Sequence, residues 1–229
     1  MEKVAFVGSY DKTDMLLYMA KILTILNKKV IVIDTTALQK SRYIIPAMKP
    51  LKKYITTFQG VDIAIGFENL EDIKQYQKEL GEVAEYEFAL IDIDSPRGYK
   101  AFEITPENKH YFVTSFDLYS LKRGLQVFKT IIAPIKVTKV LFTKEMLASE
   151  DEYLNYLSSG LRIKWNKEIV FFPFETGDQS VIYTNQRSSR IRIKGLSTQY
   201  MDSIMFIVED FSGMQEKLIK RAVKVLEKN

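Results

Sequence analysis

Short apolar runs alternate with segments of helical periodicity along the whole chain. This alternation is typical of parallel strands joined by crossover helices that cover the sheet. The expected strands are Val4–Val7, Val30–Ile33, Asp62–Ile65, Phe88–Asp92, Tyr111–Thr114, Lys139–Phe142 and Glu168–Phe172. The expected helices are Asp14–Asn27, Leu70–Leu80, Leu118–Ile132, Glu150–Gly160 and Tyr200–Lys228, the last with a possible break at Phe211–Gly213. We therefore predict a doubly wound, mostly parallel α/β sheet flanked by helices.

The composition restricts the number of domains and the available chemistry. The 229 residues, 46% of them apolar, fit one globular domain that spans residues 1–229. The absence of cysteine excludes disulfides and thiolate metal sites, and the single histidine, His110, leaves no cluster for zinc and no Ser-His-Asp relay. No apolar run reaches the ~20 residues that span a bilayer, and Met1 leads into a short strand without a signal peptide. We therefore expect a cytoplasmic protein.

The segment after the first expected strand retains part of a phosphate-binding loop. Its residues are Gly8, Ser9, Tyr10, Asp11, Lys12 and Thr13. Such a loop curls backbone N–H groups around phosphates, adds a lysine that pairs with them, and uses a threonine hydroxyl to hold Mg²⁺. Lys12 and Thr13 supply the last two parts. Asp11 stands where a glycine would allow close approach of the backbone, and its carboxylate would repel phosphate unless it turned outward.

A second interpretation of the same loop needs no ligand. Asp11 or Thr13 would cap the helix that follows, because side-chain oxygens accept hydrogen bonds from free N–H groups of a first helical turn. Lys12 would then serve in part to neutralise Asp11. The loop residues alone do not separate these two interpretations.

Two carboxylates follow the buried run that begins at Phe88. Asp92 and Asp94 are two residues apart and therefore point to the same side of a strand. Ligands of open parallel sheets collect at the carboxyl ends of strands, where an aspartate can hold Mg²⁺ directly or through water. The alternative is that both carboxylates cap the turn before Pro96.

The order of these motifs resembles that of the MinD/ParA group of P-loop ATPases, the deviant-Walker-A branch that also includes the pilus-associated TadZ proteins. The resemblance covers nearly the whole chain. The family's Lys-Gly-Gly-x-Gly-Lys-Thr loop aligns with Val7–Thr13, its Asp-x-Asp strand end with Asp34–Thr36, and its Asp-Ser/Thr-Pro-x-Gly element with Asp94–Gly98. Tyr111–Leu121 resembles the family's next strand and helix start, and Pro173 falls at its base-contacting turn.

The resemblance implies that ATP or ADP binds with Mg²⁺ at the carboxyl end of the first strand. The nucleotide-binding residues that it implies are Gly8, Ser9, Tyr10, Asp11, Lys12, Thr13, Asp34, Asp94 and Pro173, with Thr13 and Asp94 as ligands of Mg²⁺. It also implies a homodimer that works with a protein partner in a larger machine.

Two departures from the family pattern argue against hydrolysis. Val7 replaces the first loop lysine, which reaches across the family's dimer to the partner's nucleotide, and Thr36 replaces the aspartate that positions the attacking water. Loss of a trans-acting cation can lower the rate of phosphoryl transfer by ~10³-fold or more. Nucleotide binding without hydrolysis is still possible, because Gly8, Lys12, Thr13, Asp34 and Asp94 could hold a phosphate and Mg²⁺.

A basic stretch and the C-terminal helix suggest further partners. The cations of the stretch are Arg187, Arg190, Arg192 and Lys194. Clustered cations bind nonspecific DNA, but alternation with Ile191 and Ile193 also fits a strand with one solvated face, which we favour. The basic, amphipathic segment Met214–Lys228 matches a peripheral membrane helix or, as we favour, a terminal helix packed on the fold.

Two functions follow. In the first, the chain is a MinD/ParA-like nucleotide-binding protein with impaired or absent hydrolysis that acts as a positioning or scaffold component in secretion, pilus assembly, conjugation or partition. In the alternative, it is an active ATP-dependent dimeric switch for plasmid or chromosome partition that binds nonspecific DNA.

Overall fold

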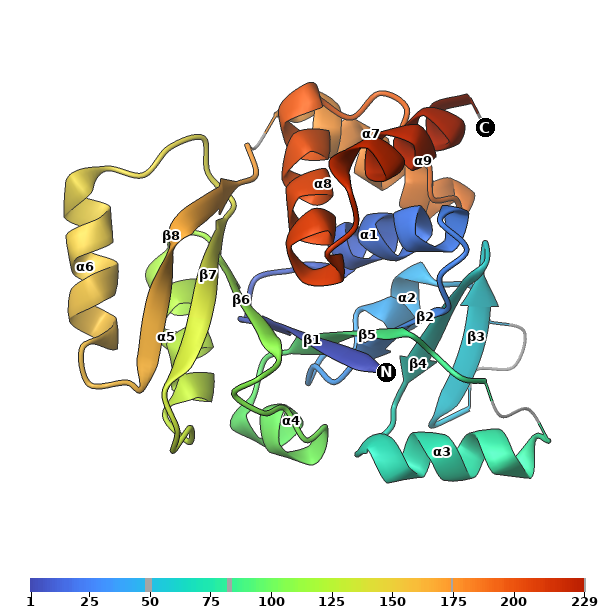
Figure 1. Cartoon of the computed structure of the whole chain (residues 1–229), viewed down its shortest axis with the longest axis horizontal. Coiled ribbons are helices and arrows are strands. Elements are labelled where there is room, and N and C mark those ends of the chain that lie inside the picture. Colours follow the sequence, from blue (N-terminus) through green and yellow to red (C-terminus); the bar gives the residue numbers. More distant parts are fainter. Residues whose placement is uncertain (48–50, 82–83, 174, 229) are drawn as a thin grey trace.

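One mixed sheet forms the centre of the protein. The computed structural model describes residues 1–47, 51–81, 84–173 and 175–228. The strands are β1 (Glu2–Val7), β2 (Val30–Asp34), β3 (Tyr54–Phe58), β4 (Val61–Ile65), β5 (Phe88–Ile93), β6 (Lys109–Thr114), β7 (Ile135–Leu141) and β8 (Ile163–Phe171). In the described residues these eight strands have the order β3-β4-β2-β5-β1-β6-β7-β8, and only β3 is antiparallel to its neighbour (Figure 1). The predicted doubly wound, mostly parallel sheet is confirmed.

Helices cover both faces of this sheet. They are α1 (Thr13–Ile25), α2 (Ser41–Ile44), α3 (Leu70–Glu79), α4 (Pro96–Ala101), α5 (Leu118–Phe128), α6 (Ala148–Ser158), α7 (Thr176–Ser188), α8 (Thr198–Ser212) and α9 (Glu216–Lys228). Figure 1 shows α1, α7, α8 and α9 grouped on one side of the sheet, whereas α3 and α4 lie on the other.

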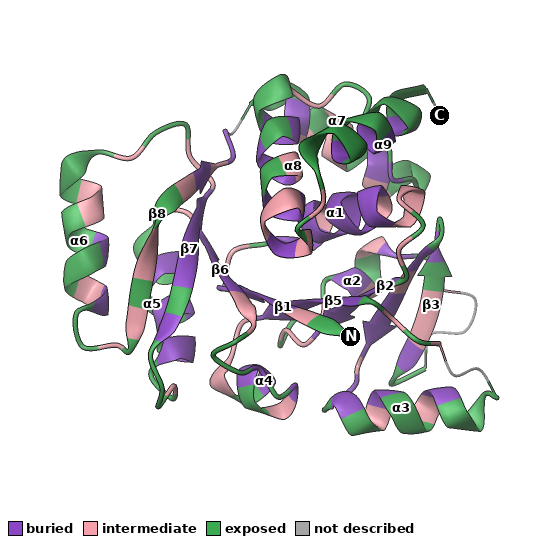
Figure 2. Ribbon diagram, viewed as in Figure 1, coloured by how far each residue is buried: buried purple, intermediate pink, exposed green. Residues whose placement is uncertain are grey.

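The pleat of β1 divides the core into two layers. Val4 and Phe6 face the layer that contains α1, α8 and α9, whereas Ala5 and Val7 face the layer that contains α3 to α6. All four side chains are fully buried, and the central strands are buried almost throughout in Figure 2. A strand covered on both faces is apolar at every position, which is why these runs show no alternation in sequence.

The sequence analysis did not predict β3. It forms a hairpin with β4 through Gln59 and Gly60, whose φ angles are 50° and 83°. A two-residue turn of this kind requires positive φ at both positions, and Asn-Gly is its usual signal. Because glutamine occupies the first position, the sequence lacks this signal and the hairpin was not predicted.

Two helical regions near the C-terminus differ in how well the sequence predicts them. The predicted helix over Tyr200–Lys228 is divided at Gly213 into α8 and α9, so the break was placed correctly. In contrast, the sequence analysis did not predict α7. Arg190–Lys194 is not a strand in the part of the chain that the structure describes, although Ile191 and Ile193 are buried as the strand interpretation required.

Candidate functional site

The loop between β1 and α1 begins at Gly8. Its backbone N–H donates to Ile93 O at 2.9 Å, which carries the loop over the end of β5. Gly8 has φ +148°, and a Cβ there would lie 2.0 Å from Val113 O of β6. Only glycine fits this position, because the neighbouring strand approaches so closely. Packing of the fold therefore accounts for Gly8 without any ligand.

Ser9 and Tyr10 turn from the loop toward its β6 side. Ser9 Oγ donates to Ser120 O at 3.4 Å, at the start of α5. The Tyr10 ring stacks on Phe142, with 4.4 Å between the ring centroids. Both side chains therefore anchor the loop to neighbouring elements.

Asp11 folds back onto the start of α1. Its Oδ1 accepts hydrogen bonds from Thr13 N at 3.2 Å and from Thr13 Oγ1 at 3.0 Å, and its Oδ2 lies 3.1 Å from Lys40 Nζ. Burial alone would raise the pKa of Asp11, but Lys40 and the Thr13 donors outweigh burial and lower that pKa. Asp11 is thus an anion, and it binds the N–H group and the hydroxyl that a bound phosphate and its Mg²⁺ would use. This resembles the capping alternative, but Asp11 lies one residue before the N-cap, Lys12, and bonds to the first N–H group of α1.

Lys12 turns into the protein rather than toward solvent. Its Nζ lies 2.6 Å from Asp92 Oδ1 and donates to Gly8 O at 2.7 Å, and its side chain is only 1% exposed. The contact with Asp92 is an ion pair rather than a well-directed hydrogen bond. Burial raises the pKa of Asp92 to about 7, with the Lys12 ammonium opposing the shift and Asp34 adding to it. Lys12 therefore neutralises Asp92, whereas Lys40 neutralises Asp11.

Little space remains above the loop. The cavity there is about 40 Å³, whereas sites for small molecules in proteins have roughly 300–1,000 Å³. Its lining consists of Gly8–Thr13 together with Thr36, Leu38, Lys40, Asp92 and Asp94. Asp92 and Asp94 thus point to the same side, as their spacing predicts.

Solved structures with this arrangement of strands and loop identify the fold. The chain is 16% identical to MinD in the MinC:MinD cell division protein complex of Aquifex aeolicus, with a TM-score of 0.58 and coverage of 94% of this chain and 97% of that one. The chain has the MinD/ParA fold. A ParA family ATPase from Chlorobium tepidum (15% identity, TM-score 0.51, coverage 98% and 96%) and Cyanothece McdA in complex with ATP (12%, 0.52, 94% and 97%) are similar to it as well. No family model matches the sequence, and no curated protein matches it.

Asp34, Asp94 and Pro173, the other nucleotide-binding residues that the MinD/ParA resemblance implies, do not lie together at the loop. Both Asp34 oxygens are occupied, Oδ1 by Thr36 and Oδ2 by Ser41 N at 3.1 Å. Asp94 Oδ2 accepts from Ala37 N at 3.0 Å, while its buried Oδ1 has no hydrogen-bond donor among the described residues. Pro173 follows β8, three strands from β1 and therefore ~14 Å across the sheet. Neither Asp34 nor Pro173 belongs to the lining of the cavity above the loop.

The turn before Pro96 is not capped by the carboxylates. Ser95 Oγ accepts from Gly98 N at 3.2 Å, so Ser95 is the cap of α4. The alternative role that the sequence left open for Asp92 and Asp94 is therefore wrong: Asp92 pairs with Lys12, and Asp94 accepts from Ala37 N.

In this arrangement the loop of the MinD/ParA fold does not fit a nucleotide phosphate with Mg²⁺. The Thr13 hydroxyl is donated to Asp11, and Lys12 is held by Asp92 and Gly8 O. Asp94 Oδ1 has no hydrogen-bond donor and Thr13 Oγ1 keeps its lone pairs, but the described residues hold no group of three metal-binding side chains. A phosphate would have to displace Asp11 before it could bind.

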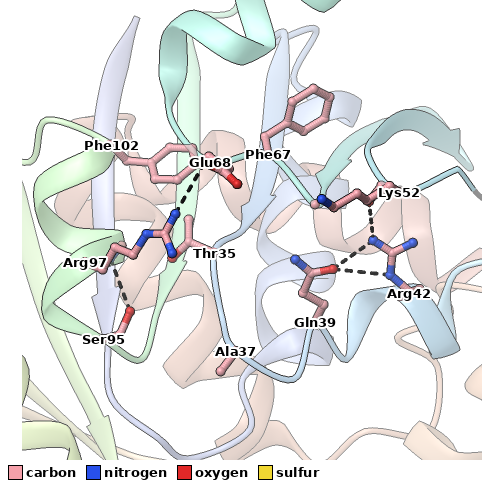
Figure 3. Close-up of a pocket in the computed structure, with 12 residues that line it drawn as sticks. Thr35, Ala37, Gln39, Arg42, Lys52, Phe67, Glu68, Ser95, Arg97 and Phe102 are labelled. Atoms are coloured by element: carbon pink, nitrogen blue, oxygen red, sulfur yellow. Dashed lines mark hydrogen bonds and ion pairs between the residues drawn. The ribbon is translucent and has the colours of Figure 1, made fainter.

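A larger cavity of about 390 Å³ lies beside the loop (Figure 3). Its two arginines are already engaged: Arg42 donates to Gln39 Oε1 and to the carbonyls of Leu51 and Lys52, and Arg97 pairs with Glu68 at 3.3 Å. Thr35, Ala37 and Gln39 line this cavity, whereas Thr36, Leu38 and Lys40 line the cavity above the loop. Residues 35–40 therefore form the wall between the two cavities.

The partner surfaces proposed from the sequence also have defined positions. Arg187, Arg190, Arg192 and Lys194 are all exposed, and within the described residues none forms an ion pair. The C-terminal helix α9 packs on α1 and α8 through Ile219, Ala222, Val223 and Leu226, as favoured from the sequence. No described helix has the length and apolar character needed to cross a membrane.

The sequence analysis did not identify Lys40 as a residue of the site, and it did not identify the partner of Asp92. Lys40 follows the second strand by six residues in a polar turn, and no pattern in the sequence connects it with Asp11. Asp92 was recognised from its spacing to Asp94, but not as the partner of Lys12. A charged residue inside an otherwise apolar strand run was the available signal, because a buried charge requires a partner.

Proposed function

We propose that this protein is a scaffold or positioning component that uses the MinD/ParA fold without hydrolysing ATP. The observation that supports the proposal is the pairing of Lys12 with Asp92, since the only lysine of the loop is withdrawn into the interior. Val7 and Thr36 stand at the two other positions where the family carries catalytic charge. Positioned charge supplies most of the acceleration in phosphoryl transfer. A protein that lacks this charge in its loop can therefore retain the fold but not hydrolyse ATP.

A scaffold of this kind acts through protein contacts. One similar structure is MinD in complex with MinC, which is an assembly of a protein of this fold with a second protein. By analogy, this chain would position a partner within a larger assembly such as a secretion, pilus, conjugation or partition apparatus. A homodimer is part of the proposal, and it would form without nucleotide.

ATP turnover in the presence of Mg²⁺ is the test of this proposal. We expect no phosphate release above that of a Lys12→Met control, and the same oligomeric state by light scattering with and without ATP. Turnover that is lost in Lys12→Met, or a monomer-to-dimer shift on addition of ATP, would overturn the proposal and favour the active switch.

The alternative, a partition switch that binds DNA, draws on one specific observation. The four cations at residues 187–194 are exposed, whereas Ile191 and Ile193 between them are buried, so all four charges face solvent. Binding to arbitrary duplex DNA that weakens with salt and is lost in Arg190→Ala/Arg192→Ala would support this function.

A further inference from the structure

The start of α1 carries an anion that belongs to the chain itself. The first N–H groups of a helix have no partner within the helix, and they attract anions together with the helix dipole. In this protein Asp11 Oδ1 accepts from both Thr13 N and Thr13 Oγ1. A phosphate-binding loop uses such an N–H group for its ligand, so the carboxylate on Thr13 N occupies the place of that ligand.

The same carboxylate reaches a second part of the chain. Its other oxygen, Oδ2, lies 3.1 Å from Lys40 Nζ. Lys40 ends the segment 35–40, which follows β2 and forms the wall between the two cavities. Asp11 therefore joins the start of α1 to this wall.

Two further carboxylates, those of Asp34 and Asp94, also bond to this wall or to the residue that follows it. Asp34 accepts from Thr36 N at 3.0 Å and from Ser41 N at 3.1 Å, and Asp94 accepts from Ala37 N at 3.0 Å. Three carboxylates of the chain, those of Asp11, Asp34 and Asp94, thus bond to residues 36–41. None of these contacts requires a bound nucleotide.

We propose that Asp11 is an internal substitute for a ligand phosphate, which closes the loop and holds residues 35–41 in one conformation without nucleotide. This inference rests on the proposed function as a scaffold and deepens it, because a surface held in one conformation is available to a partner at all times. An external phosphate would have to compete for the Thr13 donors with a carboxylate tethered two residues away, whose effective concentration is on the order of millimolar or higher.

Calorimetric titration with ATP and ADP in the presence of Mg²⁺ tests the competition. Asp11→Gly removes the carboxylate and restores the glycine of the family's loop, and we expect it to bind ATP at least about tenfold more tightly than the unaltered protein. Asp11→Asn keeps the size and one acceptor but loses the charge, so its affinity should lie between the two.

Hydrogen exchange tests the closed conformation independently. The amides of Thr36, Ala37 and Ser41 should exchange at the same rate with and without ATP in the unaltered protein. In Asp11→Gly they should exchange faster and be slowed again by ATP. Lys40→Ala, which leaves the loop sequence intact, should also accelerate them. Lys28→Ala removes a comparable exposed ion pair, with Glu87 at 2.6 Å, and should have no effect on these amides.

The results separate this inference from the proposed function. Equal ATP affinity in the unaltered protein and in folded Asp11→Gly would overturn the inference, as would unchanged exchange of residues 35–41 in both Asp11→Gly and Lys40→Ala. Tight ATP binding by the unaltered protein without turnover would overturn the inference alone. Turnover by the unaltered protein would overturn the proposed function.

Discussion

The phosphate loop and the basic segment 187–194 place their positive charges in opposite surroundings. Lys12 is 1% exposed and has a carboxylate at 2.6 Å, whereas Arg187, Arg190, Arg192 and Lys194 are exposed and have no ion pair within the described structure. A buried cation contributes to folding and cannot reach a ligand without leaving its partner unpaired. Exposed cations contribute little to folding but attract anions. In this structure the lysine of the loop is thus engaged inside the protein, whereas the cations of residues 187–194 are exposed.

Removal of the Lys12 charge should have the largest effect on stability. Lys12→Met leaves Asp92 buried without a cation, and loss of one member of a buried pair costs about 3–5 kcal/mol. Urea denaturation at pH 8 measures this loss. The double variant Lys12→Met/Asp92→Asn removes both charges and should recover much of it. A loss no larger than that of Lys40→Ala would show that the pair is not structural.

The next effect is a pH dependence that comes from Asp92. Its pKa is raised to about 7 from an ordinary value of 3.8, so between these values the native state holds a proton that the unfolded chain has released. The contribution of Asp92 to the free energy of unfolding therefore falls as pH rises from about 4 to 7, by at most about 1.4 kcal/mol per pH unit.

A comparison with Asp92→Asn isolates this contribution from other groups. Asp14, with a pKa raised to about 6 by burial, acts in the same direction, and His110, with a pKa lowered to about 4 by burial, acts in the opposite one. Both are present in the two proteins. The difference in unfolding free energy should shift in favour of Asp92→Asn as pH rises, and parallel pH profiles would contradict the assignment.

The ion pair between Lys40 and Asp11 should contribute less. Both side chains are partly exposed, at 46% and 38%, so solvent screens the pair and Lys40→Ala should lower the free energy of unfolding by no more than about 1 kcal/mol. The loss should shrink between about 0.1 and 1 M salt, where the screening length falls from about 10 to 3 Å. A loss that is independent of salt would point to packing of the Lys40 side chain instead.

The smallest effect on stability is expected in the basic segment. Arg190→Ala/Arg192→Ala should change the free energy of unfolding by less than about 0.5 kcal/mol, because neither side chain is buried or paired in the described structure. If the segment binds DNA, the slope of log affinity against log salt should fall by about 2. Lys164→Ala/Lys167→Ala removes the same charge from the exposed positions of β8 and serves as the matched control.

Local patterns were sufficient where neighbours in sequence are also neighbours in space. The buried runs at Val4–Val7 and Phe88–Asp92 became adjacent parallel strands, and Gly213 ended a helix where the break was expected. In contrast, α7 has Gly177 and several β-branched or polar residues, and long-range contacts hold it. Asp178 accepts from Ser197, and Asn185 bonds to Tyr18 and to Arg192 O. Such contacts leave no periodic signal.

The sequence by itself determined the parallel sheet, the position of the loop at the end of β1, and the presence of Asp11, Lys12 and Thr13 in that loop. Hydrophobic periodicity and the glycine that follows the first apolar run are sufficient for these. Only the tertiary structure decided which charges meet. Four charged groups, Asp11, Lys12, Lys40 and Asp92, allow more than one pairing, and burial selects between them. Lys12 and Asp92 pair in the interior because neither charge is tolerated there alone. Asp11 instead forms its ion pair with Lys40 and accepts a hydrogen bond from the start of α1.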